Sequence, residues 1–243
     1  MESRTKTAGL IIIGNEILSG RTQDTNTAHI AKRLEEIGVR LLEVRIIPDV
    51  SDTIIGTVRH FRDHFDYVFT TGGIGPTHDD KTAEAVAKAF NVELLKNQNA
   101  YRTLVEHYGD ESQMNDGRVK MTFIPEGAGL IDNPVSAAPG FIIGNVYVMA
   151  GVPKIMQGML NNIIPTLEGG DIIMSRQIII NQPESAVAET LAKIEKNFMG
   201  VDVGSYPRYK DGAPEVTIII RSTDEDMVEQ AYQSLLKSLS LNG

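Results

Sequence analysis

The sequence Tyr67-Val-Phe-Thr-Thr-Gly-Gly-Ile-Gly-Pro-Thr-His-Asp-Asp80 joins a short apolar run to a loop with three glycines in four positions. The apolar run is typical of a strand that is buried on both faces of a sheet. Apolar residues at helical spacing follow the loop over residues 82–90. A strand, a glycine-rich loop and a helix in this order form the junction where ligands bind at the carboxyl edge of parallel sheets.

The residues before this loop show the same alternation. The unbroken apolar run Gly9–Ile13 and the segment Val39–Ile47 predict two strands. Helical spacing predicts one helix that starts at 24–26 and ends near Gly38, and a second that Ser51 caps. Strands and helices that alternate in this way predict an α/β protein, with a parallel sheet covered by helices on both faces.

The remainder of the chain is less regular. Gly169-Gly170 is the best boundary, so we expect one domain over residues 1–168 and a small α+β domain over 169–243. The elements predicted in the first domain after residue 96 are a helix (97–108), an exposed loop (109–117), strands (122–124, 141–143, 146–149) and a helix (153–167). Those predicted in the second are strands (172–180, 215–221) and helices (183–198, 223–239).

Composition excludes several classes of function. The 243 residues carry a net charge of −9, so nucleic acids and anionic membranes are repelled and are not expected as partners. Cysteine is absent, which excludes disulfides, thiolate metal sites and cysteine nucleophiles. No apolar run approaches the roughly 20 residues of a membrane span, and we expect a soluble cytoplasmic protein. The one short basic segment, Tyr206–Lys210, is interpreted as a loop or an interface.

Polar side chains follow three of the predicted strands. Because the carboxyl ends of parallel strands meet at one edge, these side chains are expected to converge. They are Asn15, Glu16 and Ser19 after the first strand, Asp49 after the second, and residues 71–80 after the third. Backbone amides of the glycines, the hydroxyls of Thr71 and Thr77 and a helix N-terminus can bind a phosphate. The alternative is an ordinary tight turn, and the loop matches neither the Walker nor the Rossmann pattern.

The carboxylates of this region have competing interpretations. Asp79 is favoured as the cap of the next helix, whereas Asp80 is the preferred metal ligand or general base. For Asp49 the two interpretations, a turn residue and a functional carboxylate, are about equally favoured. Among the histidines, His60 and His64 are interpreted as a surface pair one helical turn apart, and only His78 lies in the glycine-rich loop.

Several motifs together resemble the amino-terminal domain family of CinA (competence/damage-inducible protein A), within the wider molybdopterin-binding superfamily of MogA, MoaB and gephyrin. They are Ile13-Gly-Asn-Glu-Ile-Leu-Ser-Gly20, Asp24-Thr-Asn26, Thr70 to Thr82, Ala138-Pro-Gly-Phe141 and Gly151-Val-Pro153. The resemblance implies a three-layer αβα sandwich of the MogA/MoaB type with a mostly parallel sheet, followed by a small KH-like unit.

The resemblance also implies an activity, namely divalent-metal-dependent hydrolysis of the pyrophosphate bond of a nucleotide such as ADP-ribose or FAD. The implied cofactor is Mg²⁺, Mn²⁺ or Co²⁺, with a monovalent cation as a further option. The catalytic residues are then Asp80 and Asp49, and the metal ligands Asp80, Glu16, Asn15 and Asp79, with Asn15 standing where CinA proteins usually have Asp. The expected phosphate-binding residues are Gly14, Ser19, Thr71, Gly72, Gly73, Gly75, Thr77, Thr82, Ser136, Pro139 and Gly140.

Two other functions remain open from the sequence. One is a molybdopterin-binding or adenylylating protein of molybdenum cofactor biosynthesis, with molybdopterin as its ligand. The other is a non-catalytic nucleotide-binding module, which is favoured if Asn15 disables the metal site. Under each of these functions we expect a small-molecule ligand and a homodimer.

Overall fold

Strand β1 (Lys6–Ile13) lies between β2 (Val39–Ile47) and β3 (Tyr67–Thr71) and is parallel to both. Its side chains alternate between two apolar cores, with Leu10 and Ile12 in one and Ile11 and Ile13 in the other. A strand with a core on each face must be apolar at every position, which explains the unbroken run in the sequence. The predicted strand is confirmed, and it begins three residues earlier than expected.

The computed structural model describes residues 5–210 and 212–240, and the chain divides into two units at residues 170 and 171. The first unit holds a six-stranded sheet in the order β2-β1-β3-β8-β7-β6. Strand β8 (Val146–Met149) is parallel to β3, whereas β7 (Gly140–Ile143) and β6 (Gly129–Ile131) are antiparallel additions. The sheet is therefore mostly parallel, as predicted.

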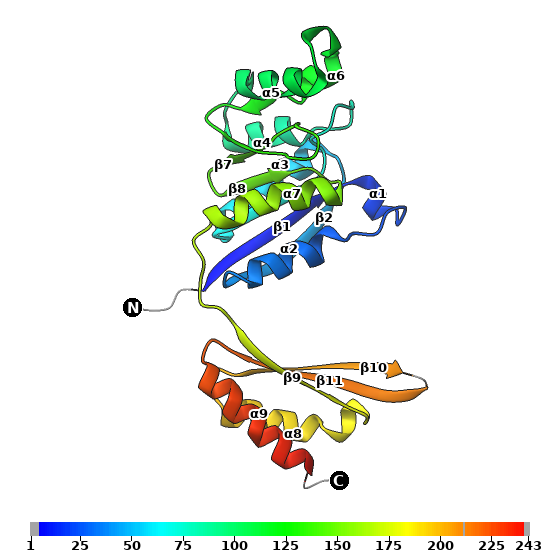
Figure 1. Cartoon of the computed structure of the whole chain (residues 1–243), viewed down its shortest axis with the longest axis vertical. Helices are drawn as coiled ribbons and strands as arrows, with labels where there is room; N and C mark the ends of the chain where they lie inside the picture. Colours follow the sequence, from blue (N-terminus) through cyan, green and yellow to red (C-terminus); the bar gives the residue numbers. More distant parts are fainter. Residues whose placement is uncertain (1–4, 211, 241–243) are drawn as a thin grey trace. The chain divides into compact units, whose positions relative to one another are not determined.

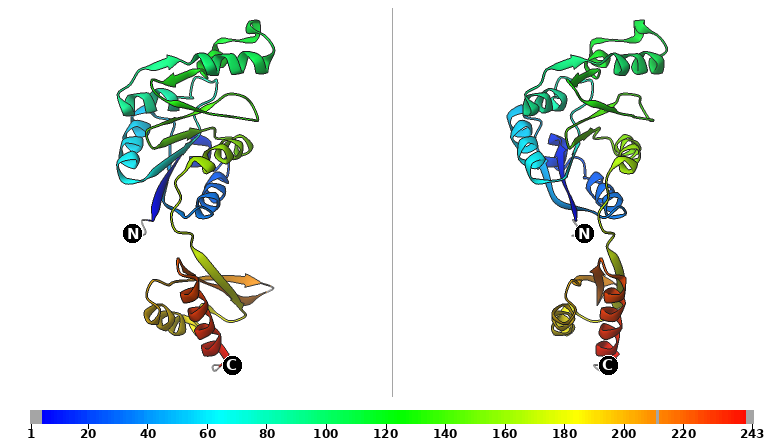
Figure 2. Two further views of the ribbon diagram at one scale, coloured as in Figure 1. Left: turned by 60° about the vertical axis from the view of Figure 1, so that its left-hand side comes forward. Right: turned by 90° about the vertical axis from the view of Figure 1, so that its left-hand side faces the viewer.

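Helices cover both faces of this sheet, which confirms the three-layer αβα sandwich (Figures 1 and 2). On one face lie α2 (Asn26–Glu35) and α7 (Pro153–Ile163), which bury Leu34 and Met159 against β1 and β3. On the other lie α3 (Ser51–His64) and α4 (Thr82–Phe90). Ser51 is the first residue of α3 and no side chain caps that helix, so the capping role predicted for Ser51 is wrong.

The segment between α4 and β6 departs from the sequence prediction. Its elements are β4 (Leu94–Lys96), α5 (Gln98–Tyr108), a 3₁₀ turn (Glu111–Gln113), α6 (Asp116–Lys120) and β5 (Phe123–Pro125), with β4 and β5 paired antiparallel. An exposed loop was expected over 109–117. Instead the Asp110 and Asn115 side chains accept backbone N–H groups of Ser112 and Arg118, and these caps start two short helical turns.

The second unit is α+β, as predicted. Its elements are β9 (Met174–Ile180), a 3₁₀ turn (Glu184–Ala186), α8 (Ala188–Asn197), β10 (Asp202–Lys210), β11 (Ala213–Ser222) and α9 (Glu225–Ser240). The strands form an antiparallel sheet in the order β10-β11-β9, and Ile218 and Ile220 of β11 lie in a core shared with Leu191 and Leu235 of the helices. The unit therefore has a hydrophobic core of its own.

Among the described residues, no helix is long and apolar enough to cross a membrane.

Candidate functional site

Four loops meet at the carboxyl edge of the parallel strands of the first unit, and hydrogen bonds tie them together. They follow β1 (residues 14–25, which include the short helix α1, Asn15–Leu18), β2 (48–50), β3 (72–81) and β8 (150–152), and we call the third the glycine loop. The Gly14 N–H donates to the Ile47 carbonyl oxygen at 3.1 Å, and the Asn15 N–H donates to Asp49 Oδ2 at 2.9 Å. The Gly72 N–H donates to the Met149 carbonyl oxygen at 3.1 Å, which joins the glycine loop to the end of β8.

Two glycines of the glycine loop are required by its backbone. Gly72 and Gly73 have φ angles of +102° and +68°, in the region that residues with a side chain rarely adopt. A Cβ atom on Gly72 would collide with the Ile13 carbonyl oxygen, and one on Gly73 would collide with Thr82 Oγ1. The turn can therefore be made only with glycine at both positions.

Thr82, the first residue of α4, holds this turn in place. It is fully buried, and its hydroxyl donates to the Gly72 carbonyl oxygen while its backbone N–H donates to the Gly73 carbonyl oxygen, each at 3.0 Å. Thr82 was expected to bind phosphate, but its donors are already engaged within the protein. Thr82 therefore supports the backbone of the glycine loop.

Unused backbone donors lie in the next part of the loop. The Gly72 N–H is engaged with Met149, whereas the N–H groups of Gly73, Ile74 and Gly75 donate to no atom of the described residues. Successive free amides in a turn form an anion-binding concavity. This short stretch is therefore the part of the glycine loop best suited to a phosphate.

The Asp80 carboxylate turns toward the loop rather than toward α4. Its Oδ2 accepts the backbone N–H of Thr77 at 2.9 Å and the Thr77 hydroxyl at 2.5 Å. The same oxygen would lie 2.7 Å from a Cβ atom on Gly75, so the carboxylate occupies the space that this glycine leaves. Asp80 thus lies beside Gly75 and lines the same cavity as Gly73 and Ile74.

Asp79 does not cap α4, so that prediction is wrong. The residue before the helix is Lys81, and no side chain accepts a hydrogen bond at this helix end. Asp79 is exposed, and the polar Thr77 side chain beside it, together with its own backbone N–H, holds the pKa of its carboxyl below the ordinary value, helped by His78 and Lys120.

Lys120, which is not among the predicted site residues, brings a positive charge to the loop. Its Nζ donates to the Thr77 carbonyl oxygen from the end of α6, 43 residues further along the chain. A cavity of about 30 Å³ lies between this lysine and the loop. Its lining includes the predicted residues Gly73, Gly75, Asp80 and Pro139. No local pattern marks this lysine, because only the fold of α5 and α6 brings it to the loop.

A second cavity of about 60 Å³ lies on the α2 and α7 side of the sheet. It is lined by Glu16, Asp24, Asn26 and Thr71, together with Ile12, Ile13, Ile17, Thr22, Gln23, Thr25, Gly151 and Pro153. Asp24 Oδ1 accepts the backbone N–H groups of Asn26 and Thr27, as expected for a helix-starting residue. The structure thus separates the predicted residues into two cavities, with Glu16 and Thr71 in this one.

The predicted metal ligands are not gathered into a metal site. The Glu16 carboxylate folds back against Gly14, Asp49 accepts the Asn15 N–H, and Asp80 is bonded to Thr77. Asp49 lines neither of the two cavities. Within residues 5–210 and 212–240, no group of three or more histidine and carboxylate side chains is placed to hold a metal ion. The described part of the chain therefore offers no ready-made cage of such side chains.

Three other predicted residues have local structural roles. The exposed Ser19 donates to the Glu16 carbonyl oxygen at 3.2 Å, and Ser136 accepts a hydrogen bond from Asn133 Nδ2 at 2.7 Å. Gly140 begins β7, where a Cβ atom would collide with the Val148 carbonyl oxygen. None of these three lines either of the two cavities.

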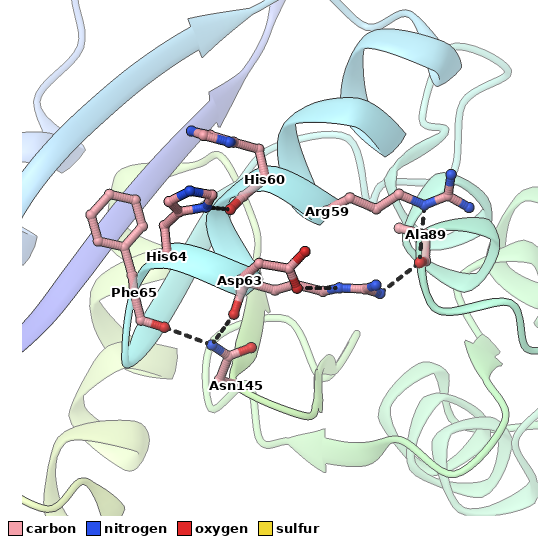
Figure 3. A network of polar contacts seen from close by, with 8 residues as sticks. Arg59, His60, Asp63, His64, Phe65, Ala89 and Asn145 are labelled. Carbon is pink, nitrogen blue, oxygen red and sulfur yellow. Dashed lines mark hydrogen bonds and ion pairs between the residues drawn. The ribbon is translucent and has the colours of Figure 1, made fainter.

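The histidine pair lies at the C-terminal end of α3, near the start of β3. His64 Nδ1 and the His60 carbonyl oxygen are 2.6 Å apart, and the two exposed rings lie against each other (Figure 3). In the same network, Asn145 Nδ2 donates to the carbonyl oxygens of Arg62 and Phe65. This end of the sheet is the one opposite to the glycine loop, in line with a surface pair.

Comparison with known proteins finds a family model that matches each of the two units. The sequence model described as "Probable molybdopterin binding domain" matches residues 9–169. The chain belongs to this family, in its CinA-like branch. The model described as "FAD synthase, middle domain" matches residues 172–242. A molybdopterin-binding-like domain joined to a unit of this kind indicates a nucleotide-related function.

Relatives of known sequence or structure agree with this assignment. A protein of Archaeoglobus fulgidus is 36% identical over 231 residues, which cover 95% of this chain and 97% of that protein. A CinA-like protein of Desulfosudis oleivorans is 33% identical over 250 residues, which cover 96% of this chain but 60% of that protein. The crystal structure of the protein CinA from Thermoplasma acidophilum is similar with a TM-score of 0.63 and 35% identity, covering 67% of this chain and 98% of that one.

Proposed function

We propose that this chain hydrolyses the pyrophosphate bond of a nucleotide, with ADP-ribose or FAD as the substrate class and a divalent cation as cofactor. The observation that carries the proposal is the surroundings of the glycine loop. Free amides of Gly73, Ile74 and Gly75, the Lys120 ammonium and the Asp80 carboxylate all lie beside one small cavity. In a chain with a net charge of −9, this local group of donors can hold a diphosphate where the overall charge opposes it.

Each group has a distinct part in such a reaction. The free amides and Lys120 bind phosphate oxygens and stabilise the negative charge that grows on them in the transition state. The Asp80 carboxylate, oriented by its two hydrogen bonds from Thr77, accepts a proton from the water that attacks phosphorus. The bond between that phosphorus and the bridging oxygen breaks, and two monophosphates leave.

In this proposal the divalent cation binds together with the substrate rather than to the protein alone. Mg²⁺ is commonly held by one or two carboxylates together with substrate phosphate oxygens and waters, rather than by an all-protein cage. Separate carboxylates from different loops suit that mode, since the described residues form no group of three. When bound, the cation supplies charge neutralisation of the phosphate oxygens.

The test is a substrate panel with matched variants. ADP-ribose, FAD and NAD are incubated with Mg²⁺, Mn²⁺ or Co²⁺, and AMP and FMN are measured by chromatography. We expect turnover of at least one substrate, loss of most activity in Asp80→Asn, and near-normal activity in Asp79→Asn. Absence of turnover with every substrate and metal, or full activity of Asp80→Asn, would refute the proposal.

A second candidate function is a nucleotide-binding module without catalysis, and the neutral side chain of Asn15, at a position where CinA proteins usually have Asp, favours it. In that case ADP-ribose raises the melting temperature of the protein without being consumed. The same panel separates the two functions, because it records binding and turnover on the same samples.

A further inference from the structure

The second cavity contains buried polar atoms that no protein group satisfies. Asn26 is 6% exposed and Thr71 is 1% exposed, and both line this cavity. Asn26 Nδ2 donates to the Gly151 carbonyl oxygen at 2.9 Å, which fixes the orientation of the amide. Asn26 Oδ1 and Thr71 Oγ1 have no hydrogen-bond partner. Since most buried polar atoms in proteins are paired, two unpaired atoms beside one cavity indicate a missing ligand.

The chemistry of the lining selects the kind of ligand group. Asn26 Oδ1 can only accept a hydrogen bond, and the carboxylates of Glu16 and Asp24 also accept. The Thr71 hydroxyl can donate as well as accept. The lining includes no lysine or arginine to offset these two carboxylates, whereas Lys120 lines the first cavity, so this cavity is not suited to a phosphate. A neutral group that donates hydrogen bonds, such as a hydroxyl, fits the lining.

A metal cation is a poorer fit than a hydroxyl. Asp24 Oδ1 already accepts two backbone N–H groups, and the deeply buried atoms are a neutral amide oxygen and a neutral hydroxyl. The described residues also form no group of three acidic or histidine side chains here. The buried, uncharged atoms Asn26 Oδ1 and Thr71 Oγ1 are suited to hydrogen bonds with a sugar hydroxyl.

The position of Thr71 then identifies the part of the substrate. Thr71 directly precedes the glycine loop, and consecutive Cα atoms are about 3.8 Å apart. The first free amide is that of Gly73, two residues further on, so its Cα atom is at most about 7.6 Å from that of Thr71, and one short ligand can reach both places. In a nucleotide, the neutral hydroxyl-bearing group next to the phosphate is the ribose.

We propose that the cavity beside Asn26 and Thr71 binds the ribose hydroxyls of the nucleotide whose diphosphate lies on the glycine loop. This inference rests on the proposed function and names a second part of the same substrate. It moves Thr71 from the phosphate site, where the sequence placed it, to a sugar site.

Neighbouring threonines allow a matched test. Thr70 and Thr71 are both buried and both have an unpaired hydroxyl, but successive residues of β3 point to opposite faces of the sheet. Thr70 does not line the second cavity. Thr71→Val and Thr70→Val each remove one unpaired hydroxyl at nearly constant volume. Both variants are expected to melt at or above the wild-type temperature, which checks that they fold.

Binding of ADP and of 2′,3′-dideoxyadenosine 5′-diphosphate is measured by calorimetry for all three proteins with Mg²⁺ present. The wild type is expected to prefer ADP by about tenfold, the effect of roughly one hydrogen bond. Thr71→Val should show a clearly smaller preference while still binding both nucleotides, and Thr70→Val should retain the wild-type preference.

Equal affinity of the wild type for ADP and its dideoxy analogue, or a preference in Thr71→Val as large as that of the wild type, overturns the proposal. Either result leaves the proposed function standing if ADP-ribose or FAD is still hydrolysed. If the wild type neither binds nor hydrolyses any nucleotide, the proposed function and this inference fail together. Loss of the preference in both variants overturns it too, because the effect is then not specific to this cavity.

Discussion

Replacement of Gly73 by alanine should destabilise the first unit strongly. The alanine must adopt a φ angle near +68°, which costs roughly 1–2 kcal/mol for a residue with a Cβ atom. Its Cβ atom also displaces the Thr82 hydroxyl, and the lost hydrogen bond to the Gly72 carbonyl oxygen costs about 1–3 kcal/mol. The two effects together give an expected loss of about 2–5 kcal/mol.

The assay is scanning calorimetry of the whole chain. Two units with separate cores need not unfold together, so the transition of the first unit is followed by itself. Gly56→Ala is the matched control. Gly56 lies in α3, and a Cβ atom there has open space around it, so alanine should stabilise the same unit by about 0.5–1 kcal/mol. If Gly73→Ala is as stable as the wild type, the argument from loop geometry is wrong.

Four further predictions follow from individual contacts. Lys120→Met should weaken ADP-ribose binding about tenfold in calorimetry, the effect of roughly one charge-assisted hydrogen bond, whereas Lys120→Arg should retain most of the affinity. Mn²⁺ titrated without nucleotide should show no tight site by electron paramagnetic resonance, and one tight site on the same protein would contradict the substrate-borne cation. Asp79 has a lowered folded-state pKa, so its stabilising effect is present above the ordinary pKa of 3.8 and is lost as the pH falls through the lower value. Asp79→Asn should therefore show a flatter acid limb of melting temperature against pH than the wild type does. Asn145→Ala removes donors to two carbonyl oxygens and should cost about 2 kcal/mol in denaturant unfolding while leaving nucleotide turnover unchanged.

The sequence is informative wherever burial alone dictates residue type. The run Gly9–Ile13 has a core on each face, so its apolar character and its place in a parallel sheet can be read directly. The helices α2 and α4 show an apolar stripe because each packs one side on the sheet. These patterns are local, and the elements they predict were found.

Strand β10 shows where local reading fails. It contains Gly204 and Pro207, which normally argue against a strand, and residues 206–210 were expected to be a loop or an interface. At the edge of a sheet a proline is tolerated, because the N–H it lacks can face away from the partner strand. Only the pairing with β11 shows that this segment lies at an edge.

The loops that form the candidate site could be predicted from the sequence, but the contacts between their side chains could not. Residues from different strands could be assigned to one edge, but not to separate cavities. Lys120 was missed because a helical turn capped by Asn115 brings it to the glycine loop from far along the chain. Asp79 was wrongly predicted as a cap because α4 begins after Lys81, with no side-chain cap, and the loop backbone turns the Asp80 carboxylate toward Thr77.

The hydrogen bonds that attach the glycine loop to Thr82 and Met149 affect both the affinity and the selectivity with which the loop binds a ligand. A loop fixed at both ends loses little conformational entropy when an anion arrives, so affinity does not depend on ordering the backbone at the moment of binding. The Gly72 amide hydrogen, which is already bonded to Met149, should then exchange with solvent at nearly the same rate before and after ligand addition, whereas those of Gly73, Ile74 and Gly75 should slow because the ligand accepts them. Selectivity must consequently come from the side chains around the loop rather than from closure of the loop itself.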